Sequence, residues 1–388
     1  MYATLMSNEE VRMRGDRPPN QPMFYYFDLE ERIRPDHPLR QIKARVDGTL
    51  REMSRAFTAA YSQLGRPSIP PEQLLKALLL QALFSIRSER QLVEQIDVNL
   101  LFRWFVDLPL DVPAWDATTF TKNRERFEQH GLIQRFFSGV VHQAMAEGLV
   151  SAEHFTVDGT LIQSWASLKS LRPLAEADQP VSAGADDDDP GNPTVNFRGE
   201  RRTNATHRSV TDPEARLARK GDGKPALLSH AGHLLMENRQ GLCVGVLVTE
   251  TNGHAEREAV GPLLARARAE GLRPRTLGLD KGYRAGAFLA RLETQHHVVP
   301  HVPMPAEPVR GDGPEAEARR RARRRMRQLG WALSQRIRKR VEEIVGWMKT
   351  VGGVARTRHV GRWKIAQVAT LVGAAYNLIR LARLATVT

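Results

Sequence analysis

The sequence predicts an α/β fold class, in which an all-helical N-terminal part precedes helices layered on a mixed sheet. Two observations predict it. Before about residue 150 the apolar side chains recur at helical spacing, and from His154 onward extended, β-branched stretches alternate with helical ones. With 388 residues, 41% of them hydrophobic, the chain is long enough to bury the cores of two or three domains.

Three parts of the chain differ in composition. Residues 1–22 are polar and rich in proline, which predicts a flexible leader. Residues 23–150 predict a helical N-terminal domain, with helix starts near Pro38 and Pro70. Residues 151–388 predict the α/β domain. Loop excursions are expected in it at about 169–225 and 303–327, where Pro, Gly and charged residues replace the apolar period.

The elements expected in the α/β domain alternate in type, which is typical of helices layered on a mixed sheet. They are a strand from His154, a hairpin over 231–251 that turns at 239–241, a helix over 253–272, a strand over 275–283, a helix over 284–295, a strand over 296–302, a helix over 331–350 and a closing helix over 364–384.

The charge balance favours a polyanionic partner. Lys and Arg number 57 against 44 Asp and Glu, a formal net charge of +13, so nucleic acid is expected ahead of an anionic membrane. The single cysteine, Cys243, excludes an intrachain disulfide and a cysteine metal cluster. No signal peptide is evident, and Arg380 and Arg383 interrupt the C-terminal apolar stretch. We therefore expect a cytoplasmic, nucleoid-associated protein without a membrane partner.

A segment of the helical part is a candidate for DNA reading. Asp116 and the threonines after it are good helix-capping residues, and Lys122 and Arg124 follow on the same expected helix. This pattern suits a recognition helix of helix-turn-helix type. It suits an ordinary packing helix better, so both interpretations stay open.

Two aspartates follow apolar strand segments. Asp158 follows Phe155–Val157, Asp280 follows Leu277–Leu279, and glycine-containing turns come next. In open α/β sheets, ligands bind where strands end, although each Asp alone is more often an ordinary turn or cap residue. With Glu342 as a third hard oxygen ligand, the set suits two Mg²⁺ or Mn²⁺ ions that act on a phosphodiester.

The helix expected over 331–350 separates two neighbouring glutamates. An apolar stripe runs along it through Val341, Ile344 and Met348, and Glu342 lies at the border of this stripe while Glu343 points elsewhere. The basic residues Arg338 and Lys349 lie on either side of Glu342, at positions from which they would hold DNA phosphates. The alternative is an amphipathic helix with a solvated charged face.

Other polar clusters carry weaker signals. His254 and Glu256, and the group His296, His297 and His301, match no zinc-ligand spacing, so exposed or hydrogen-bonded side chains are favoured over metal ligands. No phosphate-binding glycine loop is present, which disfavours a nucleotide-driven motor.

Three motifs together resemble the DDE transposases of bacterial insertion sequences, in the branch typified by insertion sequence five. The first is Asp158 at a strand end, and the second is an Asp-x-Gly-Tyr turn, matched by 280–283. The third is a signature of Tyr, two residues, Arg, three residues, Glu, six residues, Lys. Its last three members are matched by Arg338, Glu342 and Lys349, whereas Gln335 stands at the Tyr position.

Similarity to that family extends through 65–95, 99–108 and 115–127, and so covers about residues 24–384. The resemblance implies a ribonuclease-H-like catalytic core that cuts at transposon ends and joins the freed 3′-hydroxyl to target DNA. It implies Mg²⁺ or Mn²⁺, expected as two ions, double-stranded DNA partners (terminal inverted repeats and target DNA), and a homodimer or larger assembly on DNA. The residues implied are Asp158, Asp280 and Glu342 as catalytic metal ligands, and Arg338, Lys349, Lys122, Arg124, Lys281 and Tyr283 as DNA contacts.

Two other functions are compatible with the same residues. One is a nuclease or resolvase that hydrolyses DNA without strand transfer. The other is a non-enzymatic DNA-binding regulator derived from a transposase.

Overall fold

The computed structural model describes residues 28–62, 68–151, 153–177, 202–221 and 223–385, so the predicted leader lies outside the described residues. Every element described before residue 150 is a helix, as the apolar spacing predicts. These helices are α1 (Leu29–Arg32), α2 (Pro38–Glu52), α3 (Ser54–Ala60), α4 (Pro71–Leu83), α5 (Glu89–Val98), α6 (Leu100–Val106), α7 (Thr118–Gln129) and α8 (Leu132–Ala146).

A mixed sheet follows, which confirms the α/β class. Its central strand β1 (His154–Gln163) pairs antiparallel with β5 (Leu227–Glu237) and parallel with β7 (Thr276–Gly278), and β7 pairs parallel with β8 (Val299–His301). The far edge of β5 pairs antiparallel with β6 (Cys243–Glu250) and, at its start, with β4 (Arg216–Ala218). The expected hairpin is thus β5 and β6.

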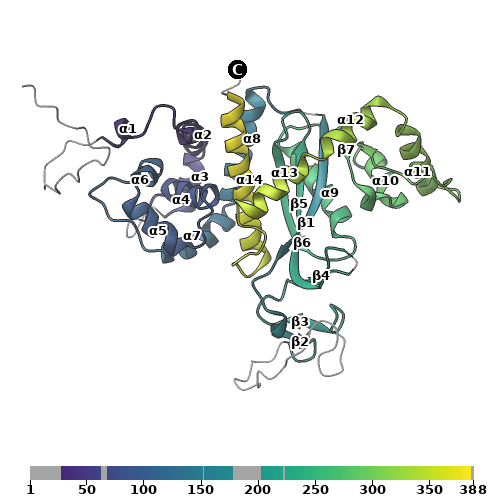
Figure 1. Cartoon of the computed structure of the whole chain (residues 1–388), viewed down its shortest axis with the longest axis horizontal. Coiled ribbons are helices and arrows are strands. Elements are labelled where there is room, and N and C mark those ends of the chain that lie inside the picture. The colour runs from purple at the N-terminus through teal and green to yellow at the C-terminus, as the bar shows by residue number, and fades with distance from the viewer. Residues whose placement is uncertain (1–27, 63–67, 152, 178–201, 222, 386–388) are drawn as a thin grey trace, which may run out of the picture.

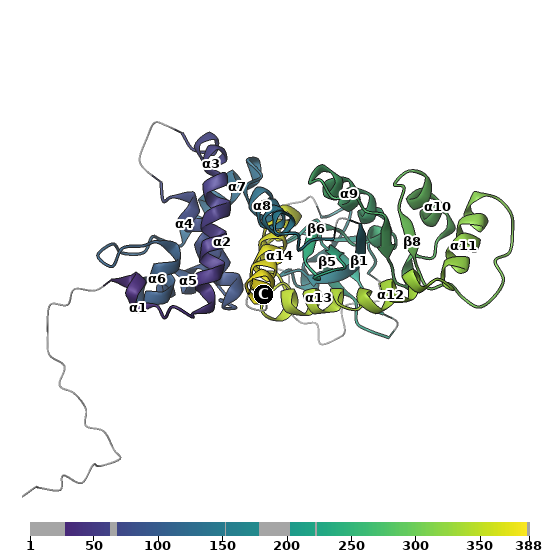
Figure 2. The ribbon, with the colours of Figure 1, turned by 90° about the horizontal axis from the view of Figure 1, so that it is seen from above.

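Helices cover and flank this sheet. Helix α9 (Ala255–Ala269) packs on β6, β5 and β1, whereas α10 (Gly286–Thr294) lies beside β8 at the end of the molecule farthest from the N-terminal helices (Figure 2). The chain then runs through α11 (Pro314–Arg325), α12 (Leu329–Arg338) and α13 (Val341–Thr350) back towards the middle of the molecule (Figure 1).

The last helix, α14 (Arg362–Ala385), lies between the N-terminal helices and the sheet (Figures 1 and 2). It contacts β6 on one side and α8 and α4 on the other, and one continuous cluster of buried apolar side chains runs through all three groups. By length and composition α14 is apolar enough to cross a membrane, but 78% of its most apolar window is buried inside the protein. Burial on most sides accounts for its apolar composition.

The helix expected over 331–350 is two helices, so that prediction was wrong in its continuity. Between α12 and α13 the amides of Arg340, Glu342 and Glu343 bond to carbonyls three residues back rather than four. These tighter turns interrupt the α-helix. The expected apolar stripe is nevertheless confirmed, since Val341 and Ile344 are fully buried and Met348 nearly so.

Both expected loop excursions contain regular structure. Within 303–327, α11 buries Ala316, Ala318 and Ala322, and Arg321 pairs with Glu293 of α10. Small alanines bury a face without the large apolar residues that mark a helix in sequence. Within 169–225, the described residues include a short turn η1 (Leu168–Ser170), the two-stranded sheet of β2 (Leu171–Pro173) and β3 (His207–Ser209), and β4, while 178–201 lie outside the described residues.

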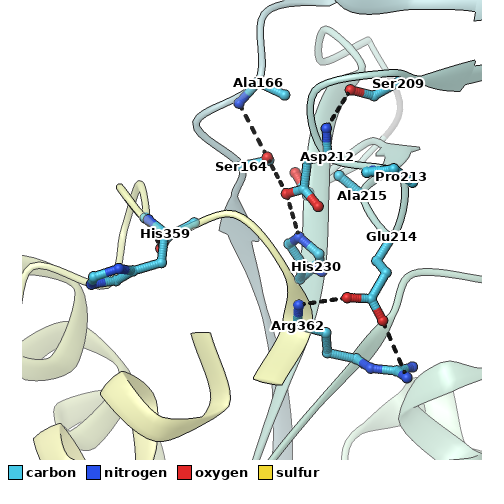
Figure 3. A network of polar contacts seen from close by, with 12 residues as sticks. Ser164, Ala166, Ser209, Asp212, Pro213, Glu214, Ala215, His230, His359 and Arg362 are labelled. Carbon is cyan, nitrogen blue, oxygen red and sulfur yellow. Dashed lines mark hydrogen bonds and ion pairs between the residues drawn. The ribbon is translucent and has the colours of Figure 1, made fainter. Parts of the chain in front are cut away.

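A buried polar cluster fixes this second excursion to the sheet. Figure 3 shows Asp212 between Ser164 at the end of β1 and His230 on β5; its Oδ2 atom accepts from Ser164 Oγ at 2.6 Å and lies 2.9 Å from His230 Nε2. All three side chains are fully buried. Burial raises the pKa of Asp212, but the hydrogen bonds from His230 and Ser164 outweigh it and hold that pKa below its ordinary value.

Candidate active site

Strand register places Asp158 level with Asp280. Thr156 on β1 pairs with Gly278 on the parallel strand β7, and each aspartate lies two residues further along. The expectation that Asp158 ends its strand was wrong, because β1 continues to Gln163 and pairs with β5 over that length. Only β7 ends here. The two carboxylates therefore lie where a parallel strand stops beside a longer central one.

The carboxylate of Asp158 is in an unfavourable place for its charge. Its pKa is raised to about 6, mainly by burial and to a smaller extent by the neighbouring Asp280 and Glu342, although the amide of Gly159 at 2.9 Å and the guanidinium of Arg338 act to lower it. Asp280 is held by the amide of Gly282, which donates to its Oδ1 at 2.7 Å. Together these contacts bring the three sequence-predicted carboxylates into one electrostatic environment.

The two neighbouring glutamates of α13 face different partners. Glu342 is close enough to Asp158 to raise its pKa, whereas Glu343 forms an ion pair with Arg380 of α14 at 3.5 Å. Arg338, one turn earlier, also acts on Asp158, and its Nε atom is buried without a hydrogen-bond partner in the described part of the chain. An unpaired buried guanidinium nitrogen is costly unless an anion completes it.

Gln335, at the position where the resembled family has Tyr, holds α12 against the sheet. Its Nε2 atom donates to the carbonyl of Leu279 at 3.1 Å and to that of His301 at 2.5 Å. Leu279 directly precedes Asp280, and His301 ends β8. The amide side chain thus ties the start of the α12–α13 segment to the strand end that carries the second aspartate.

A groove of about 720 Å³ opens at this point. Asp158 and Asp280 line it, and so do Lys349 of α13 and the exposed Arg219 and Lys220 after β4. Burial lowers the pKa of the Lys349 ammonium, and Lys220 lowers it further. Carboxylates and basic side chains therefore line the same groove. Such a lining suits the binding of a phosphate backbone next to a metal ion.

Of the other four predicted DNA contacts, two are exposed to solvent and two are buried. Lys122 on α7 and Lys281 after β7 are exposed. Arg124 is 8% exposed and forms an ion pair with Glu89, so a DNA contact would require this pair to open. Tyr283, expected at the DNA, is 1% exposed because its ring packs on Phe288 in the core.

The structure places a fourth carboxylate here, at a residue that the sequence pattern disfavoured as a metal ligand. Glu256, in the first turn of α9, lies against Gly159 and close enough to Asp158 and Asp280 for both to raise its pKa, after burial as the larger cause. A signal was present in the glycine itself: a Gly directly after a strand aspartate marks close approach of another group to the backbone. Which group approaches was not predictable, since Glu256 lies 97 residues after Gly159 in the chain, from 256 − 159 = 97.

The donor set fits a hard divalent cation in its chemistry. Carboxylate oxygens are the ligands that Mg²⁺ and Mn²⁺ prefer, and within the described residues no ion pair involves Asp158, Asp280, Glu342 or Glu256. As the side chains stand, no group of three or more His, Cys, Asp or Glu among the described residues is placed to hold a metal ion.

Comparison with known proteins gives two family matches. Residues 27–126 match a transposase domain of the DUF772 type, and residues 206–378 match a transposase DDE domain. The second match includes Asp280 and Glu342 but begins after Asp158. No curated protein sequence and no solved structure matches the chain. The two domains, in this order, support the assignment of this chain as an insertion-sequence DDE transposase.

Proposed function

We propose that this transposase cuts DNA at transposon ends and transfers the freed 3′-hydroxyl into target DNA, with Asp158, Asp280 and Glu342 as its catalytic carboxylates. The observation that carries the proposal is the gathering of these three residues from β1, the end of β7 and α13 into one electrostatic environment. They lie 122 and 62 residues apart in sequence (280 − 158 and 342 − 280), so only the fold brings them together.

The strand order supports a ribonuclease-H-like core. Three antiparallel strands, β6, β5 and β1, continue into the parallel strands β7 and β8, and the carboxylates lie on the central strand and its parallel neighbour. The branch typified by insertion sequence five is the form of the family that the motifs favour, with Gln335 as the departure from its signature.

The chemistry proposed needs no covalent enzyme intermediate. In cleavage, water attacks the phosphorus at the transposon end and the P–O3′ bond breaks, which leaves a 3′-hydroxyl. In transfer, that hydroxyl attacks a target phosphorus, and the P–O3′ bond of the target breaks. A bound divalent cation, Mg²⁺ or Mn²⁺ and in our proposal two ions, would favour both displacements by stabilising the attacking and leaving oxygens.

The chain's own residues position the reactants. The amides of Gly159 and Gly282 orient the carboxylates of Asp158 and Asp280. We assign the unpaired Nε atom of Arg338 to the scissile phosphate, because a charge-assisted bond to an anion would satisfy it. Lys349 lines the groove with Arg219 and Lys220, and there it would hold an adjacent phosphate.

Double-stranded DNA would also meet two exposed basic positions outside the groove, Lys122 and Lys281. Because two transposon ends must be joined in one reaction, we expect a homodimer or larger assembly on DNA. The positive net charge of +13 favours binding to any DNA, so end recognition requires contacts beyond charge.

A single assay separates this function from its two alternatives. Purified protein is incubated with labelled terminal-repeat DNA, unlabelled target DNA and Mg²⁺, and the products are resolved on denaturing gels. The proposal predicts end cleavage followed by joined products. Cleavage without joining would indicate a nuclease or resolvase, and binding without cleavage would indicate a regulator.

A further inference from the structure

The Glu256 side chain lies where a Cβ atom of residue 159 would be. A Cβ atom added at Gly159 would lie 2.7 Å from Glu256 Oε1 and 2.8 Å from its Cγ atom, which is closer than side chains approach one another. The Glu256 side chain therefore lies directly on the backbone of the residue that follows Asp158. Glycine at 159 leaves the space that this carboxylate occupies.

Capping does not account for this position. Acidic residues in the first turn of a helix are stabilised by the helix dipole, which would apply equally to Glu256 and Glu258 of α9. No side-chain cap bond is present at the start of α9. Both glutamates are exposed, but Glu258 accepts a hydrogen bond from Asn252 Nδ2 at 3.3 Å, whereas Glu256 lies against Gly159. Only Glu256 turns towards the aspartates.

A buried hydroxyl interacts electrostatically with the same carboxylates. Tyr283 is 1% exposed, and its hydroxyl has no hydrogen-bond partner in the described part of the chain. Burial raises its pKa most, and then Glu256, Asp158 and Asp280 in that order. Buried hydroxyls are usually hydrogen-bonded in native proteins, so an unpaired one close enough to three carboxylates for them to raise its pKa is consistent with a bound group that completes the site.

The excess of negative charge around Glu256 indicates that the group completing the site is a cation. Among the described residues, Arg257 is the cation that lowers the pKa of Glu256, and it does so less than either aspartate raises it. Carboxylates that crowd one another without a matched cation cost free energy, and a divalent ion removes that cost. Water bound to the ion would be able to accept the hydrogen bond of the tyrosine hydroxyl.

We propose that Glu256 is a fourth carboxylate of the active site and binds the same hard divalent cation as Asp158 and Asp280. This inference rests on the proposed function for the identity of the site, but it is tested by metal binding rather than by activity.

The test measures Mn²⁺ binding to the full chain without DNA, by calorimetry and by the loss of the free-ion electron paramagnetic signal. Glu256→Gln is expected to weaken Mn²⁺ binding about 10-fold or more, as the loss of a charged ligand does. Glu258→Gln, the matched control on the same helix turn, is expected to bind as the wild type does. Gly159→Ala, which displaces the Glu256 side chain, is expected to weaken binding in the same direction.

Folding is checked by circular dichroism and thermal unfolding in EDTA, where Glu256→Gln should be at least as stable as the wild type because it removes a repelling charge. Equal Mn²⁺ affinity of Glu256→Gln and wild type, or no Mn²⁺ binding by the wild type, would overturn the inference. Failure of the proposed function would give a different result. If the wild type binds Mn²⁺ through Glu256 but does not cut terminal-repeat DNA, Glu256 is still a metal ligand and the proposed transposition chemistry is wrong.

Discussion

Replacing Asp158 by Asn should stabilise the metal-free protein at neutral pH while it abolishes cleavage. Burial and the nearby carboxylates raise the pKa of Asp158 from 3.8 to about 6, so its ionised form is disfavoured in the folded state. A shift of about 2 units corresponds to about 3 kcal/mol if the group is shielded from water. Because Asp158 is only half-buried, screening reduces the expected gain to roughly 1–2 kcal/mol.

The pH dependence has a definite sign. Below about pH 4 the carboxyl is protonated in both folded and unfolded states, so the variant and the wild type should differ little. Between about pH 4 and pH 6 the unfolded state loses its proton first, so the wild type loses stability as pH rises. The advantage of Asp158→Asn should therefore grow over this interval and stay constant above it.

Urea unfolding in EDTA would measure this difference at pH values about one unit apart, namely about 4.5, 5.5, 6.5 and 7.5. The difference should appear as a shift in the urea concentration at the unfolding midpoint, with an unchanged dependence of the unfolding free energy on urea. Asp111→Asn, an exposed position between α6 and α7, is the matched control and should show no such pH-dependent gain. The reasoning is refuted if Asp158→Asn is no more stable than the wild type at the highest pH, or if its advantage is the same throughout.

Three further predictions concern the groove and its support. Glu342→Ala should abolish end cleavage and Glu343→Ala should keep most of it, because Glu343 pairs with Arg380 instead of facing Asp158; equal losses would contradict the assignment of faces. Loss of Arg338 or Lys349 should weaken DNA binding and reduce the slope of log K against log salt by about 1, and an unchanged slope would remove that residue from the contacts. Asp212→Ala should cost about 3 kcal/mol or more in urea unfolding, because it leaves His230 buried without its partner; a loss below about 1 kcal/mol would show that the pair is not stabilising.

The sequence allowed the sheet, its hairpin and two of the site's aspartates to be predicted, because alternating apolar segments and the turns after them are local patterns. Helical periodicity also distinguished Glu342 from Glu343, and the structure places them beside different partners. Glu256 was not predictable in this way. Its approach to Gly159 depends on how α9 crosses β1, and no local pattern encodes that crossing.

The helix break and α11 escaped prediction for related reasons. The interruption between α12 and α13 consists of residues with ordinary helical backbone angles and tighter hydrogen bonds, and no glycine or proline marks it. Helix α11 buries only alanines, so its arginines dominate the sequence pattern and resemble a solvated excursion. In both cases the local sequence is compatible with more than one structure, and tertiary contacts determine which of them forms.

The position of Glu342 relative to Asp158 is set by a short closed path through the chain. Helix α13 leads into residues 351–361, where the carbonyl of Ala355 accepts from the Gln163 amide at 3.1 Å and the amide of Thr357 donates to the Gln163 carbonyl at 2.9 Å. Gln163 ends β1, the strand that carries Asp158. The first and third carboxylates therefore lie on elements that are joined again beyond the groove, and from that junction the chain enters α14, whose far side packs on α8 and α4.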